Sequence, residues 1–258
     1  MHLIDGQPYI DLTNEIDFEG LLSIENEIAY GLAKSRWYIR DTGAGTRNCY
    51  DKTLPSLQDM IKMIHDPETP NYNYYKKLGF NISDCFIFAK YTGAYQAMGQ
   101  SLSLRNFTTE AQKSDNWITR KSDSSAVSDS ACFDNFPSLK KWINDLKIFD
   151  ETGRIVFFMN APEERHSLHK DAFVGHVDNF ILINLHLDRK TIFIYDDETK
   201  QTLDINSRAF VFDVRNWHGS KSTSHSWSLR IDGKFNPTWA RAMGFWDYFD
   251  TSKRMAFK

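Results

Sequence analysis

The feature that most constrains the fold of this chain is a series of short β-type runs in its second half. Six runs rich in β-branched and aromatic residues follow one another with turns between them, at residues 154–160, 179–187, 191–196, 201–205, 208–214 and 227–235. Closely spaced short strands of this kind are typical of a sandwich or jelly roll. The sequence therefore predicts a β core over residues 151–237.

The first 150 residues are predicted to be mainly helical. Apolar residues recur at helical spacing in residues 18–34, and Pro55 and Pro137 each open a further helix. Residues 91–106 are expected to form a loop or a short strand, and the serine-rich residues 113–134 a long loop that serves as a lid or as a connection.

Helices followed by strands indicate an α+β fold with one domain over residues 1–258. In this interpretation residues 1–150 form the mainly helical part, residues 151–237 the β core, and residues 238–258 a helical segment rich in Trp, Phe and Met that packs back onto it.

Composition excludes several classes of partner. Lys and Arg number 31 against 34 Asp and Glu, so the formal net charge is −3 and no global basic field attracts nucleic acid or anionic lipid. No apolar run approaches the roughly 18 residues that a membrane span needs, and the first residues do not resemble a signal peptide. Three scattered cysteines, Cys49, Cys85 and Cys132, suit reduced thiols, so we expect a cytoplasmic protein.

One pattern in the β half carries chemistry. His176 and Asp178 precede the run 179–187, and at the extended mouth of a strand their side chains emerge on the same face. The run 208–214 leads directly to His218, so a second imidazole could reach the same mouth. Two histidines and one carboxylate can form the facial triad that holds Fe(II) and leaves coordination positions open.

With these motifs and a downstream strand arginine, Arg230, the chain resembles the Fe(II)/2-oxoglutarate-dependent oxygenases of the double-stranded β-helix superfamily. It looks most similar to their aspartyl/asparaginyl β-hydroxylase and proline hydroxylase branch, because His186-Leu187 ends the strand after the first motif and Phe212-Asp213 precedes the distal histidine. The resemblance covers roughly residues 165–237.

The resemblance implies a role for each matching residue. His176, Asp178 and His218 would hold the iron, Arg230 would grip the distal carboxylate of 2-oxoglutarate, and His186 would lie beside the iron-proximal end of that cosubstrate. A guanidinium fork suits a carboxylate better than an ammonium does. The chain departs from the branch at Asn184, where an arginine is common.

A second His-x-Asp motif, His169-Lys170-Asp171, lies close to the first. Either motif has an interval to His218 that is compatible with the superfamily. His176 is preferred because it is followed at once by a strand that ends in His-Leu.

The activity implied is hydroxylation of an amino-acid or peptidyl side chain by dioxygen, with release of succinate and CO2. Trp217 and Arg215, which flank His218, are the candidates for contact with that substrate. Two other classes remain open: a cupin-like isomerase or hydrolase with a different metal, and a jelly roll that binds a ligand without catalysis.

Overall fold

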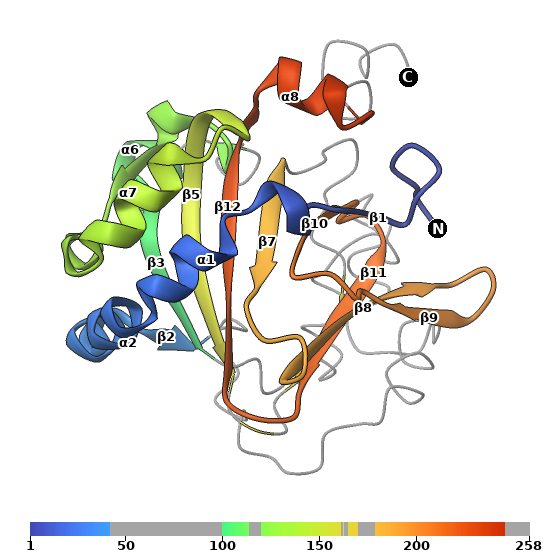
Figure 1. The fold of residues 1–258 in the computed structure, drawn as a ribbon, viewed down its shortest axis with the longest axis horizontal. Coiled ribbons are helices and arrows are strands. Elements are labelled where there is room, and N and C mark those ends of the chain that lie inside the picture. The colour runs from blue at the N-terminus through green and yellow to red at the C-terminus, as the bar shows by residue number, and fades with distance from the viewer. Residues whose placement is uncertain (42–99, 114–119, 161, 163–164, 170–178, 246–258) are drawn as a thin grey trace.

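The structure is a computed structural model that describes residues 1–41, 100–113, 120–160, 162, 165–169 and 179–245. Within these residues the chain forms two antiparallel β-sheets with a layer of helices on one side (Figure 1).

The larger sheet has eight strands in the order β1-β10-β7-β12-β5-β3-β2, with β4 paired to β3. Their bounds are β1 Tyr9–Asp11, β2 Arg40–Asp41, β3 Gln100–Phe107, β4 Val127–Asp129, β5 Phe149–Asn160, β7 Phe180–Asn184, β10 Ala209–Phe212 and β12 Ser226–Phe235. The smaller sheet has the order β6-β11-β8-β9, with β6 Arg165–His169, β8 Lys190–Asp196, β9 Gln201–Asp204 and β11 Trp217–Ser222.

From β5 onward the chain passes back and forth between the two sheets, except that β8 and β9 follow each other within the smaller one. β5, β7, β10 and β12 are neighbours in the larger sheet, and the strands that come between them in the sequence, β6, β8, β9 and β11, form the smaller one. This winding is that of a double-stranded β-helix, so the prediction of an α+β chain with a jelly-roll core is confirmed.

The helices are short and several begin with a recognisable cap. They are α1 Phe18–Ser23, α2 Glu25–Lys34, α6 Thr109–Gln112, α7 Pro137–Asp145 and α8 Pro237–Ala242, with 3-10 turns η1 Thr13–Glu15, η2 Arg36–Tyr38, η5 Ser124–Ala126 and η6 Ala131–Asn135. Both α7 and α8 carry proline in the first turn, where its missing N–H costs nothing. The Asn236 side chain accepts a hydrogen bond from the Trp239 N–H and caps α8.

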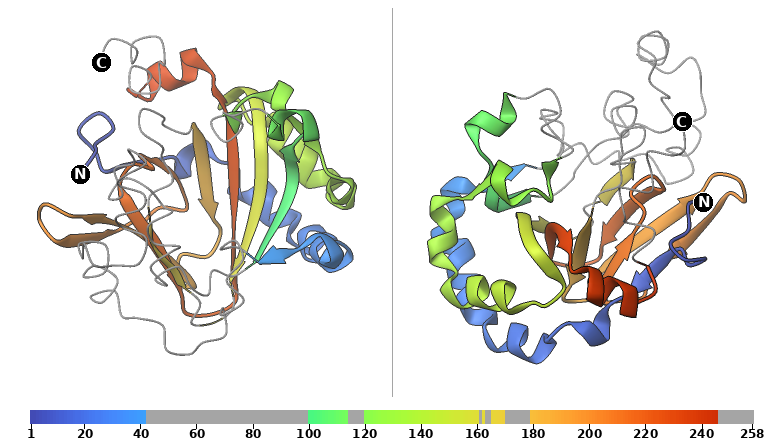
Figure 2. Two further views of the ribbon diagram at one scale, coloured as in Figure 1. Left: turned by 180° about the vertical axis from the view of Figure 1, so that it is seen from behind. Right: turned by 90° about the horizontal axis from the view of Figure 1, so that it is seen from above.

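Two apolar cores lie on opposite faces of the larger sheet. On the outer face Leu229, Ile231 and Phe157 pack with residues of α1, α2, α7 and η6, such as Leu21 and Phe133. Figure 2 shows these helices as a layer on that side. On the inner face, aromatic residues of β7 and β10 meet aliphatic residues of β8 across the jelly roll; this inner core consists of Phe180, Ile192, Ile194, Ile205, Phe210, Phe212 and Val214.

The structure refines the helices expected in the first half. Residues 18–34 form two helices, because Ile24 leaves helical geometry between them. Leu21 and Ile28 are buried, whereas Leu22 on the same predicted face is exposed. The helix expected at Pro137 is confirmed as α7, and the helix expected at Pro55 lies outside the described residues.

The serine-rich segment is not one long loop, so that prediction is wrong for its described part. From residue 120 onward the chain forms η5, pairs β4 with β3 and enters η6. The reason is burial of small and aromatic side chains between the serines, notably Ala126, Cys132 and Phe133. Serine content alone does not prevent a segment from packing.

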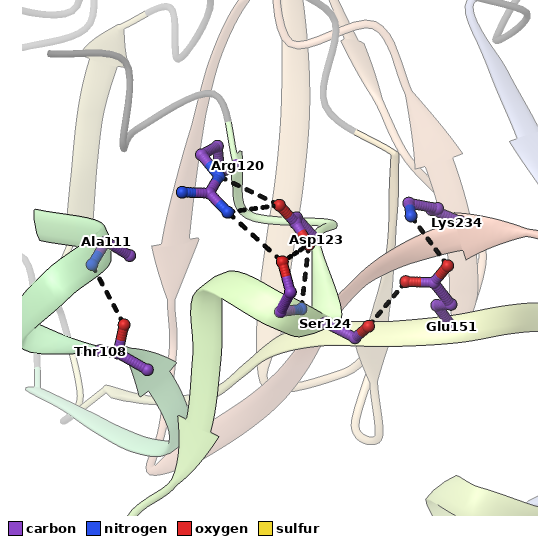
Figure 3. A network of polar contacts seen from close by, with 8 residues as sticks. Thr108, Ala111, Arg120, Asp123, Ser124, Glu151 and Lys234 are labelled. Atoms are coloured by element: carbon purple, nitrogen blue, oxygen red, sulfur yellow. Dashed lines mark hydrogen bonds and ion pairs between the residues drawn. The ribbon is translucent and has the colours of Figure 1, made fainter. Parts of the chain in front are cut away.

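A polar network fixes the start of this segment (Figure 3). Arg120 donates two hydrogen bonds to Asp123 Oδ2, at 3.0 and 2.7 Å, and Ser125 donates from its backbone and hydroxyl to Oδ1. The hydrogen bonds from Ser125 and then Arg120 lower the pKa of Asp123 from 3.8 to about 2. Ser124 donates to Glu151 of β5, which also pairs with Lys234 of β12.

Among the helices of the described residues, none is both long enough and apolar enough to cross a membrane.

Candidate functional site

His218 lies on the inner face of the jelly roll, near the start of β11. It is the one predicted iron ligand whose side chain the structure describes, since His176 and Asp178 lie outside the described residues. Its ring is 7% exposed and meets the Phe212 ring edge-on, with the centroids 4.9 Å apart. An aromatic wall therefore covers one side of the imidazole.

The orientation of the His218 ring is set by the backbone just before it. Nδ1 lies 2.9 Å from the carbonyl oxygen of Asn216. A carbonyl oxygen can only accept, so this contact selects the tautomer that carries its proton on Nδ1 and its lone pair on Nε2. An imidazole held in this way is prepared to bind a metal through Nε2.

Position 169, the last residue of β6, is the register partner of His218 in the smaller sheet. Residues directly opposite each other in an antiparallel pair lie on the same face, with Cβ atoms about 5 Å apart. The backbone thus brings the histidine of the second His-x-Asp motif to His218. Asp171 of that motif lies outside the described residues.

Arg230 lies on the inner face of β12 and is 6% exposed. Its Nε and Nη2 each lie 2.9 Å from Asp232 Oδ1, and its guanidinium stacks over the Phe180 ring at 4.2 Å. Asp232 is fully buried and also accepts from Arg154 Nε at 3.0 Å. Arg230, which was predicted to bind a carboxylate of the cosubstrate, is therefore already oriented by the carboxylate of Asp232.

A second buried cation, Lys190, was not singled out by the sequence. It begins β8 in the smaller sheet and reaches across the jelly roll to the larger one, where Nζ donates to Asn160 Oδ1 at 2.9 Å and to Ser228 Oγ at 3.1 Å. Lys190 is 3% exposed. The sequence does contain a signal for it, because Lys190 opens a strand whose next inward positions are apolar.

Next to Lys190, two buried amide atoms lack a hydrogen bond within the described residues. They are Asn160 Nδ2 and Asn184 Oδ1, from residues that are 4% and 1% exposed. Buried polar atoms are rarely left unsatisfied, and such an atom often faces a ligand or a bound water. Asn160 Nδ2 is thus a buried donor beside the Lys190 ammonium.

His186 is not brought near His218. It lies in the turn between β7 and β8, where Nε2 is 3.6 Å from Glu25 Oε1 of α2. β8 starts four residues later and pairs Lys190 with Ser222, whereas His218 pairs with Ile194 at the far end of that strand. The two histidines therefore lie toward opposite ends of the jelly roll.

Trp217 and Arg215, the predicted substrate contacts, do not share the inner face with His218. Trp217 is 2% exposed and, because successive residues of a strand alternate, lies on the other face of β11, opposite Tyr195 of β8. Arg215 turns back onto the fully buried Asp213 and donates to both carboxylate oxygens. That contact tightens the turn between β10 and β11.

Among the side chains that the structure describes, no group of three His, Cys, Asp or Glu could hold a metal ion. Of the predicted ligands, only His218 has a described side chain, because His176, Asp178 and Asp171 lie outside the described residues. The described residues present one oriented imidazole and two buried cations, Lys190 and Arg230, on the inner face of the jelly roll.

Comparison with known proteins gives solved structures but no sequence family. No family model matches the chain, and no curated protein matches its sequence. Among solved structures it is similar to a 2OG-Fe(II) oxygenase family oxidoreductase from Burkholderia pseudomallei, with 9% identity over 52% of this chain and 66% of that one and a TM-score of 0.33.

Two further structures show the range of the similarity. A prolyl-4-hydroxylase from Pseudomonas putida has 13% identity over 42% of this chain and 66% of its own, with a TM-score of 0.27. An RmlC-like cupin protein from Desulfovibrio desulfuricans has 14% identity over 31% of this chain and 70% of its own, with a TM-score of 0.24. The chain spans about two thirds of each neighbour, and its fold is defined by its own strand order.

Proposed function

We propose that this chain is an Fe(II)- and 2-oxoglutarate-dependent oxygenase that hydroxylates an amino-acid or peptidyl side chain. The observation that carries the proposal is the placement of His218. Its Nδ1 is bound to a carbonyl, it lies opposite His169 on the inner face of a jelly roll, and two buried cations face the same interior.

The iron would be held by His218 Nε2 and by one His-x-Asp motif. The sequence favours His176 and Asp178, whereas the register favours His169 and Asp171, because β6 brings position 169 directly opposite His218. The proposal keeps both motifs. Replacing His169 and His176 one at a time would show which motif holds the iron. When bound, iron and 2-oxoglutarate supply the oxidation of a C–H bond by dioxygen, with succinate and CO2 as coproducts.

The chain's own cations would bind the acid groups of the cosubstrate. Arg230 presents a guanidinium whose orientation Asp232 and Phe180 fix. Lys190, with the Asn160 amide beside it, presents a second set of donors. Ser228 contacts Lys190 and is two residues from Arg230 on the same face of β12, so both cations belong to the inner face of the jelly roll.

The aromatic residues of the inner core would keep water from the iron. Phe180 and Phe212 are nearly fully buried and pack edge-to-face beside His218, with ring centroids 5.4 Å apart. A dry wall strengthens every charge interaction inside the site. Only the family resemblance bears on the substrate, and it indicates an amino acid or a peptide.

The test is an anaerobic titration of the metal-free protein with Fe(II) and then 2-oxoglutarate, followed by visible absorption. A charge-transfer band that is present in the unchanged chain and in His225→Ala but absent in His218→Ala supports the proposal. His225 is the matched control, because it is an exposed histidine in the turn after β11.

The other outcomes point to the two other classes. Iron bound through His218 without a band on addition of 2-oxoglutarate would favour a cupin-like metal enzyme. No metal bound at all would leave the jelly roll as a binding scaffold.

A further inference from the structure

Residues 2–13, named here the brace, run along the edge of the larger sheet toward the candidate ligand His218. β1 pairs with β10, with Tyr9 opposite Phe212 and Asp11 opposite Phe210. The Leu12 N–H donates to the Ala209 carbonyl, and the Ser207 hydroxyl donates to Asp11. The brace is thus fixed along the whole length of the strand that leads into the turn before His218 (Figure 1).

The other part of the brace turns back toward that turn. Ile4 is fully buried and exchanges backbone hydrogen bonds with Gln7. Between them Asp5 and Gly6 have φ of 47° and 75°, a left-handed geometry that glycine adopts without strain. This tight turn places His2 beside Asn216.

Asn216 connects the brace to the imidazole. Its Oδ1 accepts from the His2 N–H at 2.7 Å, and its Nδ2 donates to the His2 carbonyl at 2.8 Å. The same residue's carbonyl oxygen is the partner of His218 Nδ1 at 2.9 Å. Asn216 is 3% exposed, so water competes poorly for any of these bonds.

We propose that the brace positions His218 through Asn216, whose side chain is held by His2 while its main chain fixes the tautomer and direction of the ring. The inference rests on the proposed function, in which His218 Nε2 is a metal ligand. A residue bound at both ends by backbone groups has little freedom to rotate, so its carbonyl stays directed at the imidazole. Outer partners of metal-bound histidines commonly change metal affinity by 10–100-fold when they are removed.

The test compares Asn216→Ala with Asn236→Ala, a control asparagine whose amide also joins two groups, Asp150 and the Trp239 N–H, at the start of α8. Co(II) binding by the whole chain is measured by calorimetry. We expect the dissociation constant to rise about tenfold in Asn216→Ala and to stay unchanged in the control. Asn216→Asp keeps the acceptor for the His2 N–H and loses the donor, so its dissociation constant should lie between those of the other two variants. It replaces Asn216→Ala in the test if the alanine variant does not fold.

A second readout does not depend on metal. Nitrogen-15 NMR of the histidines should show His218 protonated at Nδ1 in the unchanged chain and a mixture of tautomers in the Asn216 variants. Suppose that the Asn216 variants bind Co(II) as tightly as the unchanged chain while His218→Ala abolishes binding. That result would overturn the inferred role of the brace and leave the proposed function intact. No binding in the unchanged chain would overturn the proposed function and this inference with it.

Discussion

His169 and His218 are register partners in the antiparallel pairing of β6 and β11. The pairing shifts by a bulge immediately beyond them, between His218 and Ser220. Bulges often occur where a strand re-aims a side chain beside a functional site. Two histidine positions at one level of the smaller sheet are compatible with the proposed iron site, and the backbone register favours His169 over His176.

Substitution of the two histidines separates the motifs. We expect His169→Ala to abolish Fe(II)-dependent binding of 2-oxoglutarate, because its backbone lies opposite His218, and His176→Ala to reduce it much less. The measurement is the anaerobic titration, with thermal melting as a check on folding. Loss in His176→Ala together with full binding in His169→Ala would restore the motif that the sequence alone prefers.

Lys190 should contribute to acid binding inside the jelly roll. Lys190→Met keeps the length of the side chain and removes the ammonium that Asn160 and Ser228 accept from. We expect at least a tenfold loss in 2-oxoglutarate affinity, about 1.4 kcal/mol, since charge-assisted hydrogen bonds contribute at that level or above. Lys190→Arg is the matched control that keeps the charge. Unchanged affinity in Lys190→Met would assign the carboxylate to Arg230 alone.

Arg230→Met has a different expected signature. It removes one of the two cations that contact the fully buried Asp232, and a buried charge that loses its partner is strongly destabilising. Loss of folding stability by roughly 3 kcal/mol should accompany any loss of affinity. Urea unfolding beside the titration separates the two effects, and a fully stable variant would contradict the network described here.

Most strands that the sequence predicts have a buried apolar face, which alternating or continuous apolar residues mark; β9, which is exposed throughout, is the exception. β7, β9 and β10 fall within the expected runs, whereas β5, β8 and β12 begin before theirs. β6 and β11 lack this pattern of apolar residues. Their residues are His, Ser, Lys and Gly as often as apolar ones, since β11 directs His218, Ser220 and Ser222 inward.

The polar composition of these strands also limits how much of the site the sequence can predict. A polar inner strand is needed to hold a ligand, and polarity removes the periodicity by which a strand is recognised. The residue pattern led to His218 and the resemblance to Arg230, whereas Lys190 and Asn216 make contacts with residues 30 and 214 positions away. Contacts at that separation become visible only when the fold is known.

Acid stability should depend on Asp123. Its pKa is lowered to about 2, by hydrogen bonds from Ser125 and then Arg120, so its contribution is fully present above its unfolded pKa and is lost as pH falls from about 4 toward 2. Because the side chain is 30% exposed, we expect only about 1 kcal/mol. Asp123→Asn should lower the unfolding free energy at pH 7 and flatten its decline at acid pH. Asp145→Asn, in the exposed pair with Lys141, is the control.

Gly153→Ala tests whether the start of the serine-rich segment packs on β5. A Cβ at this position would lie 2.0 Å from the Lys121 carbonyl oxygen and 2.8 Å from the Ser122 Cα, and that carbonyl accepts from the Arg154 N–H. Backbone atoms cannot move aside as the end of a side chain can, so we expect a loss of about 2 kcal/mol in urea unfolding. Thr152→Ala, the neighbouring change without crowding, should cost less. Equal stability of the two variants would mean that residues 120–122 do not rest against the strand, and that the sequence was right to expect a loop there.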